Sequence, residues 1–143
     1  MSKTSILLVE DNEDDVLLTL TALKRLGWSK DVAVCRDGVE ALEFILCEGA
    51  HRERDSSIQP RLILMDIKLP KMDGIEVVRR IKSDPNAKAI PVVMLTSSSR
   101  QADVTAAHNA GAEHYLTKSV EFGRFSEEIG RLTRQLLGSR EPG

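Results

Sequence analysis

Aromatic side chains are scarce in this 143-residue sequence, and no excess of positive charge offsets their absence. Phe, Trp and Tyr make up only 3% of the chain, which is too few for the stacked aromatic surface of many single-strand nucleic-acid binders. The net charge is −2, so the chain as a whole offers no positive field for a phosphate backbone. We therefore expect no nucleic-acid partner.

Cysteine and long apolar runs are also nearly absent. Cys35 and Cys47 are too few for a disulfide framework and form no Cys-x-x-Cys pair, so we expect two small buried or half-buried side chains. The apolar segment at residues 6–9 is too short for a signal-peptide core or a membrane span. A single cytoplasmic domain without membrane contact is therefore expected.

Short apolar runs alternate with segments of helical periodicity along the whole chain. Strands are predicted at residues 6–9, 32–34, 62–65, 92–95 and 114–117. Helices are predicted at residues 13–26, 37–47, 75–83, 100–109 and 121–137. This alternation predicts a doubly wound α/β domain with a parallel sheet.

The segment at residues 49–60 and the apolar stripe of the last predicted helix each need a separate interpretation. Residues 49–60 form the one long irregular stretch, which we interpret as mobile surface or as a partner contact. The last helix carries an apolar stripe that we expect in the core rather than at an interface, formed by Phe122, Phe125, Ile129 and Leu132.

Polar side chains follow four of the predicted strands. Ligands of doubly wound sheets bind beyond the carboxyl ends of the strands, so these side chains should meet at one edge. They are Glu10 and Asp11, Asp66, Thr96 and Ser97, and Thr117 and Lys118. Each feature alone is common at a strand end or helix start, but their joint occurrence at one edge is unlikely to be accidental.

The chemistry of these side chains favours phosphoryl transfer with a divalent ion. Three carboxylates, Glu10, Asp11 and Asp66, repel one another unless a cation joins them, and oxygen ligands suit Mg²⁺. A lysine and a hydroxyl, Lys118 and Thr96, suit the oxygens of a phosphoryl group. Because Asp66 leaves the central buried strand, we expect it to be the nucleophile that forms an acyl phosphate.

Four blocks resemble the signature of the response-regulator receiver domain: ILLVEDN at 6–12, LMDIKLPKMDG at 64–74, PVVMLTS at 91–97 and YLTK at 115–118. The resemblance spans about residues 4–137. It implies a flavodoxin-like sheet of five parallel strands in the order 2-1-3-4-5 with five helices. It further implies a receiver domain over residues 1–138, a short tail over 139–143 and no output domain. The loop at 49–60 and the Asn-Glu-Asp-Asp run resemble the stand-alone regulators of bacterial phytochrome kinases.

Carried over by position, the resemblance assigns a role to each residue at this edge. Asp66 would accept phosphate from a histidine of a sensor kinase. Asp11 would bind Mg²⁺ directly and Glu10 mainly through water, and the backbone carbonyl of Lys68 would complete the protein ligands. Such a protein acts by changing its contacts and is not an enzyme in its own right.

The switch residues follow from the same resemblance. Thr96 would hydrogen-bond the new phosphoryl oxygens, Lys118 would pair with them, and Tyr115 would turn inward when the threonine moves. Output would then be a protein contact, and a homodimer through the helix at 100–109, the strand at 114–117 and the last helix is a reasonable hypothesis.

Two departures from the family pattern stand close to the site. Ser119 occupies the position where the family usually has proline, so a cis bond there is not favoured. Glu10 replaces the commoner aspartate and is one methylene longer, which favours contact with the metal through water.

Two rival functions are weighed against this one. A receiver-like scaffold that is never phosphorylated would typically lack the acceptor, the acidic pair or the lysine, all of which are present. An aspartyl-phosphate hydrolase needs a carboxylate two residues after the nucleophile, where this chain has Lys68.

Overall fold

The computed structural model describes residues 4–97, 100–118 and 122–137. Its strands are β1 (Ile6–Val9), β2 (Val32–Cys35), β3 (Leu62–Met65), β4 (Val92–Thr96) and β5 (His114–Thr117). Its α-helices are α1 (Glu13–Lys24), α2 (Gly38–Leu46), α3 (Gly74–Lys82), α4 (Gln101–Ala110) and α5 (Phe122–Leu137). The strands form one parallel sheet in the order β2-β1-β3-β4-β5, which confirms the predicted fold and topology.

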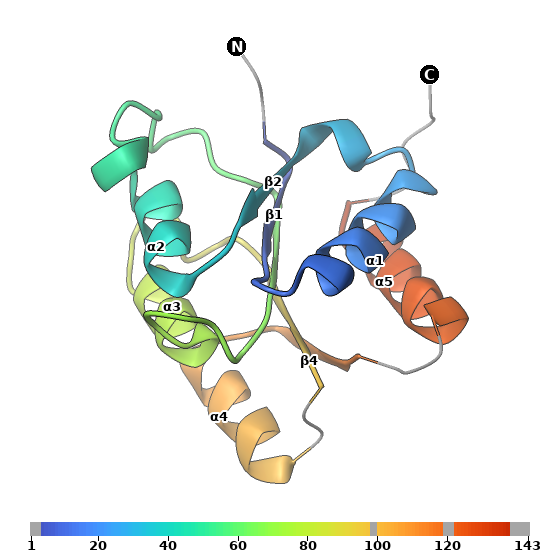
Figure 1. Cartoon of the computed structure of the whole chain (residues 1–143). Helices are drawn as coiled ribbons and strands as arrows, with labels where there is room; N and C mark the ends of the chain where they lie inside the picture. Colours follow the sequence, from blue (N-terminus) through green and yellow to red (C-terminus); the bar gives the residue numbers. More distant parts are fainter. Residues whose placement is uncertain (1–3, 98–99, 119–121, 138–143) are drawn as a thin grey trace.

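The helices cover the two faces of this sheet. Figure 1 shows α1 and α5 side by side on one face, and α2, α3 and α4 on the other. Alternate residues of each strand serve the two faces: Leu7 and Val9 pack under α2 and α3, whereas Ile6 and Leu8 pack under α1 and α5. Because both faces are covered, β1, β3 and β4 are apolar and buried almost throughout, as their unbroken hydrophobic runs predict.

Polar caps begin three of the helices at the edge where the strands end. The side chains of Asn12, Asp37 and Asp73 accept hydrogen bonds from the backbone N–H groups three residues later. Such caps satisfy donors that a helix start leaves unpaired, and each is worth about 1 kcal/mol. The chain therefore turns sharply from strand to helix, and the residues between are held at this edge.

Most predicted boundaries agree with the structure to within two residues. α1 ends at Lys24, two residues early, because the chain leaves the helix through Gly27 at φ 81°. The stretch at residues 49–60 is not entirely irregular, since it contains a short 3-10 helix at Gly49–His51.

The core of the last helix also agrees with the sequence. Phe125, Ile129 and Leu132 are buried against β1, β3 and β4, whereas the side chain of Phe122 lies outside the described residues. Cys35 is buried and Cys47 is half-buried, as expected. No helix in the part of the chain that the structure describes is long and apolar enough to cross a membrane.

Candidate functional site

Backbone hydrogen bonds continue the sheet one residue beyond its strands and bring the predicted side chains together. The N–H of Asp66 donates to the carbonyl of Val9 at 3.0 Å, and that of Lys118 donates to the carbonyl of Thr96 at 2.6 Å. The N–H of Glu10 donates to the carbonyl of Cys35 at 3.0 Å. The side chains that follow β1, β3 and β5 are therefore placed by the sheet itself.

Lys118 lies at the centre of this arrangement. Its Nζ contacts Glu10 Oε1 at 2.5 Å, Asp15 Oδ2 at 2.8 Å and Asp66 Oδ2 at 3.1 Å. An ammonium has three N–H donors, and each of the three carboxylates can take one. The side chain of Lys118 is only 14% exposed, so these charges meet away from bulk water.

Glu10, Asp11 and Asp66 form an acidic cluster that fits a divalent metal. They offer carboxylate oxygens that all lie within 4.8 Å of one another, close enough to bind a single ion. Glu10 and Asp66 are buried, whereas Asp11 is exposed. Hard oxygen ligands with an open, solvated side suit Mg²⁺ or Mn²⁺, so the residues fit the predicted ion.

Burial and the neighbouring charges together shift the pKa values of Glu10 and Lys118. Burial, opposed by Lys118 and reinforced by the charge of Asp66, raises the pKa of Glu10 from 4.5 to about 7. Burial alone would lower the pKa of Lys118, but its hydrogen bonds to Asp15 and Glu10 and the charge of Asp66 raise it. Without a metal, the raised pKa therefore favours the protonated form of Glu10 up to near-neutral pH, while Lys118 stays charged.

A close packing of two turns shapes the loop that follows Asp66. A Cβ on Gly74 would lie 2.1 Å from the carbonyl oxygen of Asp66, and a Cβ on Gly38 would lie 2.0 Å from that of Met72. Both glycines are required because backbone approaches backbone at these points. Lys71, in the same loop, has a left-handed φ of 70°.

Three further predicted residues lie on the elements that the sequence indicated, and their roles stay predictions. Thr96 is buried at the end of β4, and Tyr115 of β5 is half-buried against the core on the α4 side. Lys68 lies two residues beyond Asp66 in the loop before α3. Ser119 lies outside the described residues.

The sequence reasoning missed Asp15, which contacts Lys118 at 2.8 Å. No spacing rule points to it, because Asp11 precedes the N-cap Asn12 and lies outside α1, so the two carboxylates are not a helical pair. Glu13, Asp14 and Asp15 all lie in the first turn of α1, where acidic residues are common because the helix dipole favours them, so no sequence signal singles out Asp15.

The comparisons with known proteins agree with this geometry. The model of the response-regulator receiver domain matches residues 6–130. The chain belongs to the response-regulator receiver family. It is thus a single receiver domain over the matched length, and its acidic cluster lies at the edge where the strand ends predicted that these carboxylates would meet.

The relatives of this receiver domain include phytochrome response regulators. Response regulator Rcp1 from Synechocystis sp. is 43% identical over 114 residues, covering 80% of this chain and 76% of that protein. A crystal structure of the phosphorylated cyanobacterial phytochrome response regulator RcpA has a TM-score of 0.86 at 34% identity, covering 97% of each chain. The Mn²⁺-bound form of Rcp1 has a TM-score of 0.83 at 35% identity, covering 96% of this chain and 98% of that one.

A third relative has a different biological setting. The probable methanogenesis regulatory protein FilR2 from Methanothrix harundinacea is 38% identical over 140 residues, covering 96% of this receiver domain and 87% of that protein.

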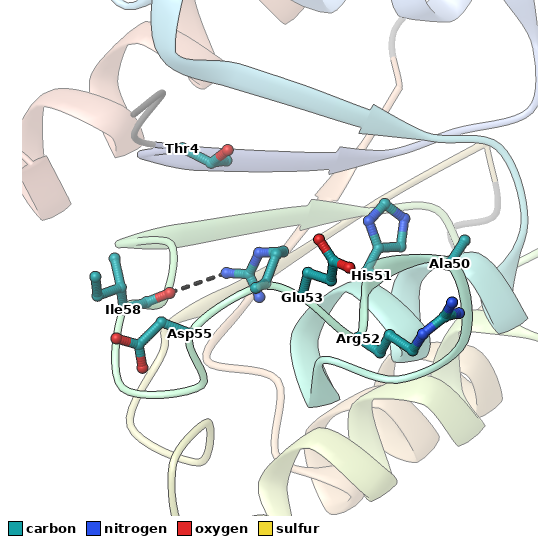
Figure 2. A pocket seen from close by; sticks show the side chains of 8 residues that line it. Thr4, Ala50, His51, Arg52, Glu53, Asp55 and Ile58 are labelled. Carbon is teal, nitrogen blue, oxygen red and sulfur yellow. Dashed lines mark hydrogen bonds between the residues drawn. The ribbon is translucent and has the colours of Figure 1, made fainter.

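A cavity of about 490 Å³ lies at the opposite edge of the receiver domain, far from the acidic cluster. Figure 2 shows it between Thr4, which precedes β1, and the loop that carries His51, Arg52, Glu53 and Asp55. A guanidinium nitrogen of Arg54 donates to the carbonyl of Ile58 at 2.9 Å in this loop, the hydrogen bond drawn in Figure 2. The cavity therefore belongs to the loop and contributes nothing to the site.

Proposed function

We propose that this receiver domain accepts a phosphoryl group on Asp66 from a sensor histidine kinase, with Mg²⁺ in the acidic cluster. The observation that carries the proposal is the contact of one half-buried ammonium, that of Lys118, with both Asp66 and Glu10. This arrangement supplies a nucleophile, a fixed cation and metal ligands at one point. The similarity to a Mn²⁺-bound and to a phosphorylated response regulator supports the same chemistry.

In the proposed transfer, a carboxylate oxygen of Asp66 attacks the phosphorus of a phosphohistidine. A P–O bond forms as the P–N bond breaks, and the departing imidazole nitrogen keeps the electron pair and takes up a proton. Mg²⁺, when bound by Glu10, Asp11 and Asp66 with the backbone carbonyl of Lys68, supplies neutralisation of the charge on the phosphoryl oxygens. Lys118 pairs with one of those oxygens and holds the acyl phosphate in place.

The proposed switch begins when the phosphoryl group adds negative charge at the carboxyl edge. The Thr96 hydroxyl turns to donate a hydrogen bond to a phosphoryl oxygen, and Tyr115 moves inward into the space that the threonine leaves. This movement alters the outer surface of α4, β5 and α5, which we propose as the output surface. The receiver domain then acts in the cytoplasm through protein contacts and not as an enzyme.

The partner kinase is proposed from the relatives. Rcp1 and RcpA are similar over most of this chain, and RcpA is a phytochrome response regulator. We therefore propose a bacteriophytochrome histidine kinase as the phosphoryl donor. A purified bacteriophytochrome kinase labelled with radioactive ATP should transfer its label to the wild type and not to Asp66→Asn, whereas transfer only from an unrelated kinase would contradict this partner.

Incubation with acetyl phosphate and Mg²⁺ tests the acceptor directly. Intact mass spectrometry should detect one phosphoryl adduct on the wild-type protein and none on Asp66→Asn, because the amide is not a nucleophile of comparable strength. Asp14→Asn is the matched control, since Asp14 is an exposed carboxylate on α1, and it should take up phosphate as the wild type does. EDTA should abolish the adduct in every variant.

An equal adduct on Asp66→Asn would contradict the assignment of the acceptor. Complete absence of an adduct on the wild type, with Mg²⁺ bound, would favour the unphosphorylated scaffold instead. Sedimentation velocity of the same samples tests the output surface: a shift toward a dimer with the adduct is expected, and a strict monomer in both states would contradict the dimer.

A further inference from the structure

The third partner of Lys118 differs in kind from the other two. Glu10 and Asp66 belong to the acidic cluster, whereas Asp15 does not. A divalent ion would therefore draw the oxygens of Glu10 and Asp66 toward itself and leave Asp15 where it is. Among the residues that the structure describes, Asp15 is the one carboxylate on Lys118 that has no place in the metal site.

The position of Asp15 on α1 is well fixed. Its backbone N–H donates to Asn12 Oδ1 at 3.0 Å, which places it in the first turn of the helix. A negative charge is stabilised there by the helix dipole, and a helical side chain points back toward the start of its helix. The carboxylate is only 31% exposed and reaches Lys118 Nζ at 2.8 Å, which is closer than Asp66 at 3.1 Å.

The ammonium group of a lysine moves easily unless a fixed anion holds it. It sits on a flexible four-carbon stem, and a divalent ion beside it would repel it. With Glu10 and Asp66 engaged by the ion, the ammonium would gain hydration by swinging out toward solvent. An anion outside the metal site removes that advantage, because it keeps the ammonium paired at its present position.

We propose that Asp15 is a positioning residue that holds the Lys118 ammonium beside Asp66 while a divalent cation occupies Glu10, Asp11 and Asp66. The inference rests on the proposed function through the metal, but the Asp15–Lys118 pair itself can be tested without metal. Asp15 contacts neither the metal nor the phosphoryl group in this scheme and acts only through the lysine.

NMR of the lysine side-chain NH₃⁺ groups tests the proposal, with the Lys118 resonance assigned by its loss in Lys118→Arg. In the wild type, the Lys118 NH₃⁺ protons should exchange slowly with water both in EDTA and in saturating Mg²⁺. In Asp15→Asn, which keeps the size of the side chain but not its charge, exchange should be several times faster in EDTA. In Mg²⁺ it should be about ten times faster, because the remaining partners are then engaged.

Two variants separate positioning from general charge. Asp14→Asn removes the same charge one residue away, where the side chain is exposed and makes no ion pair with any residue in the described part of the chain, so it should behave as the wild type. Asp15→Glu restores a carboxylate and should recover most of the protection. Titration calorimetry should show Mg²⁺ binding weakened about three- to tenfold in Asp15→Asn and less than twofold in Asp14→Asn.

The outcomes for this inference and for the proposed function can be told apart. If the wild type binds Mg²⁺ and takes up phosphate but Lys118 exchange is unchanged in Asp15→Asn, the positioning role is overturned while the function stands. If Asp14→Asn accelerates exchange as much as Asp15→Asn, general charge is responsible and the role is likewise overturned. If the wild type binds no Mg²⁺, the proposed function fails, and the comparison in EDTA still decides whether Asp15 holds Lys118.

Discussion

Two half-buried lysines at opposite edges of the sheet have nearly the same exposure and very different partners. Lys82, near the amino ends of β4 and β5, is 13% exposed, and Lys118, at the carboxyl edge, is 14% exposed. Lys82 Nζ contacts one carboxylate, Glu113 at 2.7 Å, and two backbone carbonyls, those of Lys88 at 3.1 Å and Ile90 at 2.7 Å. Lys118 contacts three carboxylates.

The difference separates a charge that stabilises the fold from a charge that can change partners. At Lys82 the charges balance one to one, and the other Glu113 oxygen accepts the N–H of Val92 at 2.8 Å, so every group has a fixed partner. At Lys118 negative charge is in excess, so a metal or a phosphoryl group can redistribute the contacts. Removal of Lys82 should therefore lower the stability of the fold. Removal of Lys118 should mainly change how the carboxylates around it bind a metal.

The largest expected effect breaks the balanced pair. Lys82→Met should lower the free energy of unfolding by about 3 kcal/mol, because three acceptors, Glu113 Oε2 and the carbonyls of Lys88 and Ile90, lose a half-buried donor. The loss should be the same with and without Mg²⁺, as measured by urea denaturation. Lys118→Met should lie within about 1 kcal/mol of the wild type in saturating Mg²⁺, because the ion replaces the ammonium among the carboxylates.

Lys88→Met is the control for this comparison. Lys88 is exposed and near Lys82, so its replacement should change stability by less than about 0.5 kcal/mol. If Mg²⁺ restored Lys82→Met to wild-type stability, both edges would respond to the metal. The proposed difference between Lys82 and Lys118 would then be wrong.

The next effect appears in the pH dependence of the metal-free protein. The pKa of Glu10 is raised from 4.5 to about 7, so between these pH values the folded protein binds a proton that the unfolded chain has lost. Stability therefore falls as the pH rises through this window, by about 2–3 kcal/mol from pH 5 to 8. Urea denaturation in EDTA at several pH values should show this slope for the wild type.

Glu10→Gln separates Glu10 from other titrating groups, because it should flatten the slope by the same amount. Mg²⁺ should also flatten it, since a divalent ion favours the ionised carboxylate. Parallel pH profiles for the wild type and Glu10→Gln in EDTA would contradict the role of Glu10. Lys82→Met should leave the slope unchanged, because Lys82 and Glu10 lie at opposite edges of the sheet.

Local features could be predicted from the sequence at both edges. Unbroken apolar runs such as Leu62–Met65 and caps such as Asp37 follow local rules, so the strands, the helices and the convergence of Glu10, Asp66 and Lys118 could be predicted. Contacts that depend on the direction of one side chain could not be predicted from the sequence at either edge. Asp15 is one of three acidic residues in the first turn of α1, and nothing in the sequence singles it out. Nothing in the sequence indicates either that Arg54 donates to the carbonyl of Phe44 at 2.5 Å and lies 4.1 Å from the centre of the Phe44 ring.

The smallest effect compares left-handed residues at the two edges. Lys71, in the loop after Asp66, has φ 70°, and Cys47, which ends α2, has φ 57°. A side chain in this conformation costs about 1–2 kcal/mol, and glycine avoids this cost. The net gain from glycine is smaller, because glycine loses more conformational freedom when the chain folds. The Lys71 side chain is 65% exposed and has an ion pair with Asp37 at 3.4 Å, whereas Cys47 Sγ lies 3.1 Å from Arg54 Nη1.

Lys71→Gly should therefore raise the free energy of unfolding by about 0.5–1 kcal/mol, since an exposed ion pair contributes little. Cys47→Gly should gain nothing, because the relief of strain is offset by the lost contact with Arg54 and by lost burial. Lys71→Ala keeps the strain and loses the side chain, so it should not stabilise. If urea denaturation finds that Lys71→Gly and Cys47→Gly raise the free energy of unfolding equally, the contact of Cys47 with Arg54 does not compensate the backbone strain at Cys47. The expected inequality would instead mean that strain is compensated at Cys47 but not in the loop beside Asp66, where glycine would relieve it.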